Sequence, residues 1–252
     1  MRIDHPTTKD IPLLRQLWKK AFPDGDDYLD IFFSQGFDVS RCRCITENGQ
    51  VLTVLYWFQI SCDNQKFAYL YAIATDPNLR GKGLCRTLVE DTKQLLADTG
   101  FHGAILVPDG DALAGMYRKM GFKFSASVRE FQRDAASVPA SFRRISAEEY
   151  ARLRMDYLPE KAVIQEGESL RLLSALCGFY AGEDWIAAAS TVKNILHCPE
   201  FLGNTDASAG LIAALDCCRG TFRTTGNQIP FAMYCPLRPD AIVPQYFAFA
   251  FD

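Results

Sequence analysis

The sequence lacks the marks of several protein classes. No stretch approaches the roughly 18 uninterrupted apolar residues that a membrane-spanning helix needs. The N-terminal residues, MRIDHPTTKD, do not show the charged-then-apolar pattern of a secretory signal. Basic residues are not in surplus, because the formal net charge is -3 and the pI is about 5.7. We therefore expect a cytoplasmic protein with no membrane partner and no nucleic-acid partner.

The sequence also lacks a recognisable metal or disulfide framework. Its nine cysteines are scattered and odd in number, and no two CxxC motifs form a zinc site. Cys42 and Cys44, like Cys217 and Cys218, are too close in sequence for ordinary disulfides. We expect reduced cysteines packed as small apolar residues, and no bound metal.

What is present is a globular composition with a mixed pattern of helices and strands. The 252 residues are 48% hydrophobic and 23% charged, which suits one large domain or two of roughly 100–150 residues. Hydrophobic spacing predicts helices over residues 7–22, 26–35, 84–99 and 112–120. Strands are predicted over residues 43–47, 51–61, 66–75, 101–107 and 122–132, with a hairpin turn at Asn48-Gly49. This order predicts a mixed α/β sheet.

Residues 137–139 read as a linker to a second, smaller α/β module. Helices are predicted over residues 146–158, 169–180 and 206–217, and strands over 185–190, 192–197, 221–223, 231–234 and 246–252. The order of elements repeats that of the first module at low similarity. We therefore expect domains at residues 1–136 and 137–252, the second a degenerate copy of the first fold.

The segment TDPNLRGKGL, between a buried strand and an amphipathic helix, carries the strongest chemical signal. Gly81 and Gly83 permit a tight turn and a close backbone approach to a ligand. The amides that follow lie at a helix N-terminus, which attracts anions, and Arg80, Lys82 and Arg86 add positive charge. The segment is neither a Walker loop nor a complete dinucleotide fingerprint. It predicts a site for a pyrophosphate.

A second motif, GMYRKMGF, follows at the end of a predicted helix. Together with AIATDPNLRGKGLCRTLV, it resembles the two signature motifs of the Gcn5-related N-acetyltransferase (GNAT) superfamily, over about residues 3–132. Asn78 stands where that family usually has Gln or Arg, and Cys85 stands where a further glycine often occurs. The family binds phosphate there mainly through backbone groups, so neither departure removes the predicted site.

The resemblance implies a set of donor contacts for acetyl-coenzyme A (acetyl-CoA). Ile73, Ala74 and Thr75 would pair by backbone with the pantetheine arm, at an edge where their strand splays from the next. An amide near Ile73 or Ala74 would polarise the thioester carbonyl. The pyrophosphate would be held by a run of seven residues: Arg80, Gly81, Lys82, Gly83, Leu84, Cys85 and Arg86.

The resemblance also implies a general acid, Tyr117, which would protonate the departing thiolate. The alternative is a core aromatic whose hydroxyl has a structural partner. Arg118 and Lys119, on the same helix, belong to a solvated face or contact the 3′-phosphate.

The general base is less defined by the sequence. Glu47, His102 and His197 are candidates, but for each of them we favour a structural or solvated role over that of a base. The segment ILVPDGDALAGMYRKMGF, followed by a second module, resembles the enhanced-intracellular-survival branch of the superfamily, which uses a terminal carboxylate as base. This points to Asp252, with a frayed terminus as the alternative.

The leading hypothesis is an N-acetyltransferase that moves an acetyl group from acetyl-CoA to a primary amine by direct attack in a ternary complex. The acceptor would be a small molecule or a peptide. Five aromatic residues alternate along the strands, and we expect them to pack in the sheet core, although some could line the acceptor pocket. They are Tyr56, Trp57, Phe58, Tyr69 and Tyr71. The alternatives are a non-catalytic acyl-CoA-binding protein and an aminoacyl-tRNA-dependent transferase of the same fold, which the acidic pI disfavours.

Overall fold

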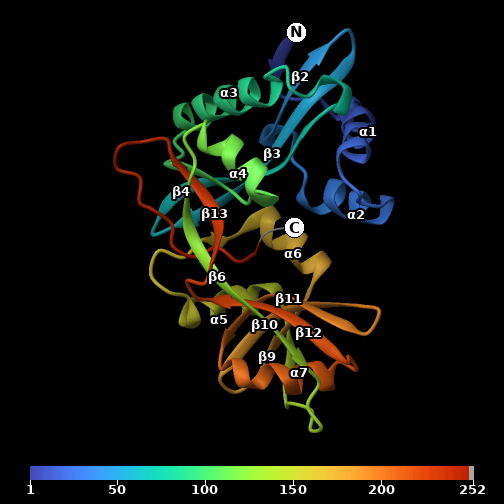
Figure 1. Cartoon of the computed structure of the whole chain (residues 1–252), viewed down its shortest axis with the longest axis vertical. Helices are drawn as coiled ribbons and strands as arrows, with labels where there is room; N and C mark the ends of the chain where they lie inside the picture. Colours follow the sequence, from blue (N-terminus) through green and yellow to red (C-terminus); the bar gives the residue numbers. More distant parts are fainter. Residues whose placement is uncertain (250–252) are drawn as a thin grey trace. The chain divides into compact units, whose positions relative to one another are not determined.

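The chain passes repeatedly between two α/β units, which the computed structural model describes over residues 1–249 (Figure 1). The N-terminal unit consists of Met1–Lys123, Glu166–Leu172 and Met233–Val243. The C-terminal unit consists of Phe124–Gln165, Leu173–Ala232 and the segment from Pro244 onward. The expected division into independent domains at residues 1–136 and 137–252 stays a prediction. No helix among residues 1–249 has the length and hydropathy needed to cross a membrane.

The N-terminal unit is a mixed sheet with helices on both faces. Its strands lie in the order β1-β2-β3-β4-β5-β13, antiparallel except for the parallel pair β4 and β5. Its elements are β1 (Arg2–Asp4), η1 (Thr8–Asp10), α1 (Ile11–Ala21), α2 (Asp26–Ile31), the π-helical turn η2 (Phe32–Gly36), η3 (Val39–Arg41), β2 (Cys42–Glu47), β3 (Gln50–Cys62), β4 (Gln65–Thr75), η4 (Pro77–Leu79), α3 (Leu84–Asp98), β5 (Gly103–Leu106) and α4 (Gly110–Arg118).

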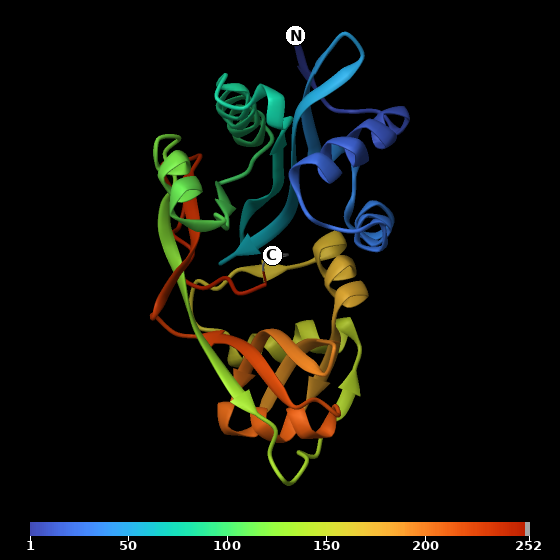
Figure 2. The same cartoon turned by 45° about the vertical axis from the view of Figure 1, so that its right-hand side comes forward.

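Helices α1 and α2 cover one face of strands β2–β4, and α3 covers the other (Figure 2). Trp18 of α1 is 1% exposed, and its ring lies 5.5 Å from that of Tyr56 on β3. On the opposite face, Arg43 of β2 reaches α3, where its guanidinium donates to the Asp91 carboxylate. The alternation of strand side chains toward the two helix layers gives this sheet an apolar core on both sides.

The last strand of the N-terminal sheet comes from far along the chain. Strand β13 (Ile229–Pro236) places its C-terminal half antiparallel to β5, with Met233 opposite Leu106 and Pro236 opposite Gly103. Gly103 is required there, because an added Cβ would lie 2.5 Å from the Tyr234 ring. The pattern of the sequence does not reveal this pairing.

The C-terminal unit is a second mixed sheet, in the order β6-β12-β11-β10-β9-β7. Trp185, Phe201 and Phe222 centre its apolar core, together with Leu211 and Ile212 of α7. Its elements are β6 (Lys123–Asp134), β7 (Arg143–Ile145), α5 (Ala147–Tyr157), β8 (Ile164–Gln165), β9 (Gly178–Ala181), β10 (Trp185–Val192), β11 (Ile195–Gly203), η5 (Thr205–Ala207), α7 (Ser208–Ala214) and β12 (Arg219–Thr225), and helix α6 (Gly167–Leu176) begins in the other unit.

Three predicted elements of this second unit end differently in the structure. The helix predicted over residues 169–180 stops at Leu176, because the chain then joins the sheet as β9. The strand predicted over residues 192–197 is interrupted by a hairpin turn at Lys193 and Asn194, both with positive φ. The final strand predicted over residues 246–252 is reduced, within the described residues, to a single bridge between Ala162 and Tyr246.

Candidate functional site

The site begins where β4 and β5 diverge. Their parallel ladder runs from Phe67 opposite Gly103 to Tyr69 opposite Ile105. Strand β4 continues to Thr75, whereas β5 ends at Leu106. Within the described part of the chain, residues 72–75 therefore have no strand partner on the β5 side. That edge offers backbone N–H and C=O groups to a ligand.

The same stretch of β4 contains a bulge. Val54 pairs with Ala74 and Tyr56 pairs with Tyr71, so two residues of β4 oppose the single Leu55 of β3. One of the two, Ala72, has a φ of 46°, a left-handed conformation that is uncommon for a residue other than glycine. Bulges release backbone groups from the ladder, and strained backbone of this kind concentrates at functional sites.

The loop after β4 presents the N-terminus of α3. Gly81 and Gly83 have φ values of 79° and 81°, and Gly83 is the N-cap of the helix. An added Cβ at either glycine would meet no atom within 4 Å, so the space beside the loop is open. The first amides of this 15-residue helix have no intrahelical partner, and the helix dipole favours an anion there.

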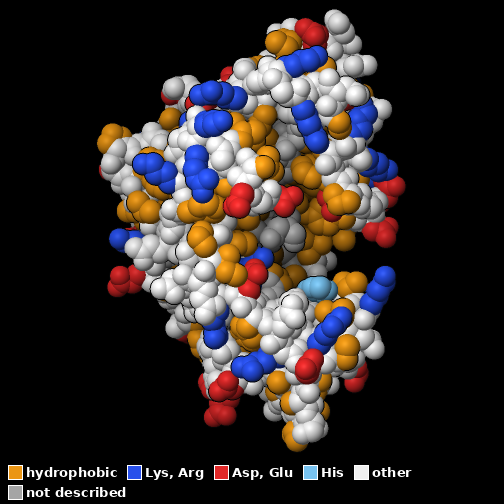
Figure 3. Space-filling model, viewed as in Figure 1, with side chains coloured by type: hydrophobic (Ala, Val, Ile, Leu, Met, Phe, Trp, Pro, Cys, Tyr) orange, Lys and Arg blue, Asp and Glu red, His pale blue; other side chains and the backbone are white. Residues whose placement is uncertain are grey.

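Three cations surround that helix terminus. Arg80 donates to the Thr75 carbonyl oxygen at 3.4 Å, and Arg86 donates to the Lys119 carbonyl oxygen at 3.3 Å. No carboxylate among the described residues forms an ion pair with Arg80, Lys82 or Arg86. Lys and Arg side chains gather over the region that Figure 1 labels α3 and α4 (Figure 3). The terminus therefore carries positive charge that the described residues leave unneutralised.

These parts border one cleft of about 610 Å³ in the N-terminal unit. Its walls come from the end of α1, the open edge of β4, the loop, the first turn of α3 and helix α4. The lining residues are Ala21, Phe22, Pro23, Ile73, Ala74, Thr75, Leu79, Arg80, Gly81, Gly83, Leu84, Cys85, Arg86, Asp109, Leu113, Met116, Tyr117, Lys119 and Met120.

Tyr117 borders this cleft from helix α4. The residue is 6% exposed, and its ring packs edge-on against Phe122 at 6.0 Å. Its hydroxyl has no hydrogen-bond partner among residues 1–249. Burial, with a smaller contribution from Cys85, raises the pKa of Tyr117 well above its ordinary value, so the phenol stays protonated at neutral pH. Burial also raises the pKa of the Cys85 thiol, to about 11.

The cleft brings together nearly all of the predicted donor-binding residues and Tyr117. Lys82 lies exposed in the loop without lining the cleft, and Asp252 lies outside the described residues. The other candidate bases do not line the cleft: Glu47 is in the β2–β3 hairpin, His102 directly precedes β5, and His197 is in the C-terminal unit. Sequence reasoning did not identify the wall formed by residues 21–23, because nothing in that segment marks a ligand contact.

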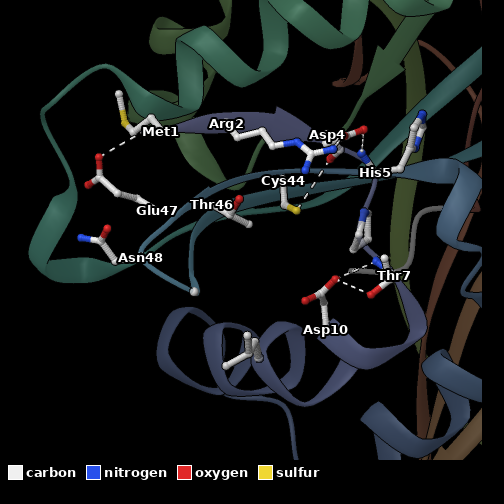
Figure 4. Close-up of a pocket in the computed structure, with 13 residues that line it drawn as sticks. Met1, Arg2, Asp4, His5, Thr7, Asp10, Cys44, Thr46, Glu47 and Asn48 are labelled. Carbon is white, nitrogen blue, oxygen red and sulfur yellow. Dashed lines mark hydrogen bonds and ion pairs between the residues drawn. The ribbon is translucent and has the colours of Figure 1, made fainter.

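The N-terminal unit has a second cavity, of about 560 Å³, between α1 and the β2–β3 hairpin (Figure 4). Several of its polar groups are paired with one another. Arg2 contacts Asp4, the Thr7 amide and hydroxyl donate to Asp10, and the Met1 amine lies 3.4 Å from Glu47. These paired groups are less available to a ligand than the amides and cations that border the cleft.

Residues 2–125 match the family model described as an acetyltransferase (GNAT) domain. This segment is a GNAT acetyltransferase domain. The resemblance deduced from the loop and from the Tyr117 motif is thus confirmed. No curated protein shows significant sequence similarity to the chain.

Solved structures share the fold of most of the chain. A GCN5-related N-acetyltransferase from Kribbella flavida is 15% identical, with a TM-score of 0.70, over 92% of this chain and 70% of that one. The corresponding protein from Anabaena variabilis is 14% identical, also with a TM-score of 0.70, over 94% and 73%. Eis1 from Mycobacterium abscessus is 12% identical, with a TM-score of 0.67, over 96% and 75%. The expected two-module GNAT architecture, shared with Eis1, is confirmed at the level of the fold.

Proposed function

We propose that the GNAT domain transfers an acetyl group from acetyl-CoA to a primary amine of a small molecule or peptide, by direct attack in a ternary complex. One observation carries this proposal. The open edge of β4, the positively charged N-terminus of α3 and the protonated hydroxyl of Tyr117 all border a single cleft. The α3 N-terminus suits a pyrophosphate, the open edge of β4 suits an amide-rich arm, and the Tyr117 hydroxyl suits the sulfur of a thioester.

The donor side of the cleft is built from backbone groups. The edge of residues 72–75 would pair with the amides of the pantetheine arm, as a partner strand would. Ile73 or Ala74, at the bulge, would donate an amide hydrogen bond to the thioester carbonyl oxygen and stabilise negative charge there during attack. The amides of residues 81–85, with Arg80, Lys82 and Arg86, would hold the pyrophosphate.

Tyr117 would deliver a proton to the thiolate as it leaves. The raised pKa keeps the phenol protonated until the leaving group develops charge. A phenol of ordinary pKa about 10 is already a weaker acid than a thiol of pKa about 8.5, so its proton is retained before the reaction. Proximity and charge placement would supply the rest of the catalysis.

The acceptor amine would approach past the wall of residues 21–23, which borders the same cleft as Ile73 and Ala74. It must lose a proton to become a nucleophile. Asp252 remains the predicted base. A variant that lacks Asp252, and whose pH–rate profile keeps the wild-type limb on the acidic side, where a base becomes protonated, would exclude that role.

The experiment begins with the affinity of acetyl-CoA, measured by calorimetry, followed by a screen of primary amines that detects release of the free thiol. Tyr117→Phe should lower turnover by about 10²- to 10⁴-fold while donor affinity changes less than about twofold. Tyr157→Phe removes a phenol hydroxyl from α5 in the other unit and serves as the matched control.

The outcomes separate the alternatives. Binding of acetyl-CoA without thiol release for any amine would support a non-catalytic acyl-CoA-binding protein. Failure to bind acetyl-CoA would refute the proposed donor. Unchanged turnover in Tyr117→Phe would remove this residue from the role of general acid.

A further inference from the structure

Residues 71–76 of the N-terminal unit pair with β3 on one side only. They include the left-handed Ala72, and within the described residues the ladder between β4 and β5 ends at Tyr69. A strained bulge persists only where its surroundings determine its shape. The contacts at the two ends of the segment therefore bear on whether the bulge keeps its geometry.

Helix α2 holds the first end of the segment. The hydroxyl oxygens of Tyr28 and Tyr71 lie 2.5 Å apart, and Tyr71 directly precedes Ala72. The ring of Tyr71 also lies 5.8 Å from those of Trp18 and Phe32. Burial raises the pKa of Tyr28 to about 12, so both partners stay neutral and the contact is a phenol–phenol hydrogen bond at physiological pH.

Helix α1 holds the second end. Lys20 donates from its ammonium group to one oxygen of Asp76 at 2.8 Å. The other oxygen of Asp76 accepts from the amide of Asn78 at 3.0 Å, and the Asp76 amide donates to the Leu52 carbonyl oxygen at 2.9 Å. The Asp76 side chain is only 15% exposed. This carboxylate therefore joins α1 to the start of the loop that presents α3.

Two tethers from the α1–α2 side thus bracket the stretch that borders the cleft. Thr53 of β3 fixes its middle, because the Thr53 hydroxyl donates to the Ala74 carbonyl oxygen at 2.7 Å. Residues 21–23, which connect the two tethering helices, themselves line the cleft. The helices therefore touch the site both directly and through β4.

We propose that Tyr28 and Lys20 are positioning residues for the acyl donor: Tyr28 holds the bulge through Tyr71, and Lys20 holds the phosphate loop through Asp76. The proposal rests on the proposed function. Neither residue would touch the donor. Tyr28 would act on the polarisation of the thioester carbonyl, and Lys20 would act on the affinity for the pyrophosphate.

The test uses the full chain and two readouts that separate these roles. Infrared difference spectroscopy of bound acetyl-CoA labelled with ¹³C at the thioester carbonyl reports polarisation, and calorimetry with CoA reports affinity. In Tyr28→Phe, the carbonyl frequency should move toward that of free acetyl-CoA and turnover should fall about three- to tenfold, while CoA affinity stays within about twofold. In Lys20→Met, the CoA dissociation constant should rise about two- to fivefold. The effect is modest because the Lys20 side chain is 47% exposed, and solvent weakens its ion pair with Asp76.

Matched variants control for a merely structural effect. Lys19→Met removes the neighbouring cation of α1, which pairs with Asp26 away from the cleft, and should leave CoA affinity unchanged. Tyr71→Phe and the double variant with Tyr28→Phe should shift the carbonyl frequency no further than Tyr28→Phe alone, since all three lose the same hydrogen bond.

Three results would decide the matter. Variants at Tyr28 and Lys20 that lower only the melting temperature, with wild-type carbonyl frequency and CoA affinity, would overturn the inference alone. Additive shifts in the double tyrosine variant would overturn the role of the phenol pair. A wild-type protein that binds no acetyl-CoA would overturn the proposed function, and the inference with it.

Discussion

Both units contain a β-hairpin followed by a helix and a parallel strand, but only in the N-terminal unit does this arrangement border the cleft described above. In the N-terminal unit, the hairpin β3–β4 is followed by helix α3 and by β5, parallel to β4. In the C-terminal unit, the hairpin β10–β11 is followed by helix α7 and by β12, parallel to β11. Each hairpin also has a bulge in its second strand, because Ala188 pairs with Glu200 and Ser190 pairs with His197. The second unit therefore has the topology of a degenerate copy of the first.

The second copy has lost the groups that the first would use to bind a donor. At the bulge, Pro199 stands in the register position of Ile73, and proline has no amide hydrogen to donate. The connection between β11 and α7, with the sequence NTDA, has neither a glycine pair nor a cation. Helix α7 has 7 residues, against 15 in α3.

Side chains close the region around the second bulge. Glu200, which follows the bulge as Ala74 does in the first unit, is fully buried. Its carboxylate accepts from Arg154 at 2.6 and 2.8 Å, from the Tyr150 hydroxyl at 2.9 Å and from the Tyr246 hydroxyl at 3.0 Å. The comparison teaches that topology alone does not make a site. The first copy leaves the first amides of α3 without intrahelical partners and its three cations without a carboxylate partner among residues 1–249, whereas the second pairs the Glu200 carboxylate within the protein.

The largest expected effect comes from disrupting the Glu200 network of the C-terminal unit. Glu200→Ala leaves the buried Arg154 guanidinium and two phenol hydroxyls without their acceptor, so we expect the free energy of unfolding to fall by about 3–5 kcal/mol. Chemical denaturation monitored by circular dichroism measures this change. The matched control is Glu130→Ala, which removes the partly exposed partner of Arg223 and should cost at most about 1 kcal/mol. Equal losses in the two variants would show that the Glu200 network is no more than a surface ion pair.

The next largest effect is expected on CoA binding, when the glycine loop of the N-terminal unit is changed. Gly81→Val forces a β-branched residue into a left-handed conformation and moves the amides that would hold the pyrophosphate. Hydrogen bonds to charged groups contribute about 1.5–3 kcal/mol each, so we expect CoA binding to weaken about 10- to 100-fold. Calorimetry should also give one CoA per wild-type chain, since the second copy lacks the loop.

Gly49→Val controls for backbone strain. Gly49 has a φ of 74° and, like Gly81, no atom within 4 Å of an added Cβ, but it borders the second cavity instead of the cleft. Both valine variants should lose stability to a similar extent, about 1 kcal/mol or more. If Gly49→Val weakened CoA binding as much as Gly81→Val does, strain and not the loop would explain the loss. Two CoA molecules per chain would contradict the comparison of the units.

Much of the first unit could be predicted because its signals are local. Gly81 and Gly83 precede an amphipathic helix, so the left-handed loop and the helix N-terminus follow from adjacent residues. The motif around Tyr117 predicted that this residue lies on a helix, and in the structure it lies on α4 and lines the cleft, while its role as general acid stays a prediction.

The features that sequence reasoning missed depend on contacts between distant segments. Met233 joins the sheet beside Leu106, and no periodicity links residues so far apart in sequence. Arg154 and Glu200 each look like an ordinary surface charge until the fold buries them together. The bulge at Ala72 is equally invisible, because its strain appears only once the register of β3 and β4 is known.

The smallest expected effect is on the alkylation rate of a thiol in the N-terminal unit, compared with the rates of two thiols in the C-terminal unit. Cys85 lines the cleft, and burial raises its pKa to about 11, so only about 1% of it is thiolate at pH 9. Alkylation by iodoacetamide should therefore be slow and should accelerate as pH rises toward 11, because the thiolate is the nucleophile. A saturating concentration of CoA should slow it severalfold by covering the cleft.

The C-terminal unit supplies two matched thiols for the same measurement. Cys218 is exposed and should react at the same rate with and without CoA. Cys198, at the closed bulge, is 3% exposed, and burial raises its pKa well above the ordinary value, so it should resist alkylation in either condition. Peptide mapping by mass spectrometry follows all three sites in one sample. Protection of Cys218 would indicate CoA bound to the second copy, whereas an unprotected Cys85 would move the donor away from the first turn of α3.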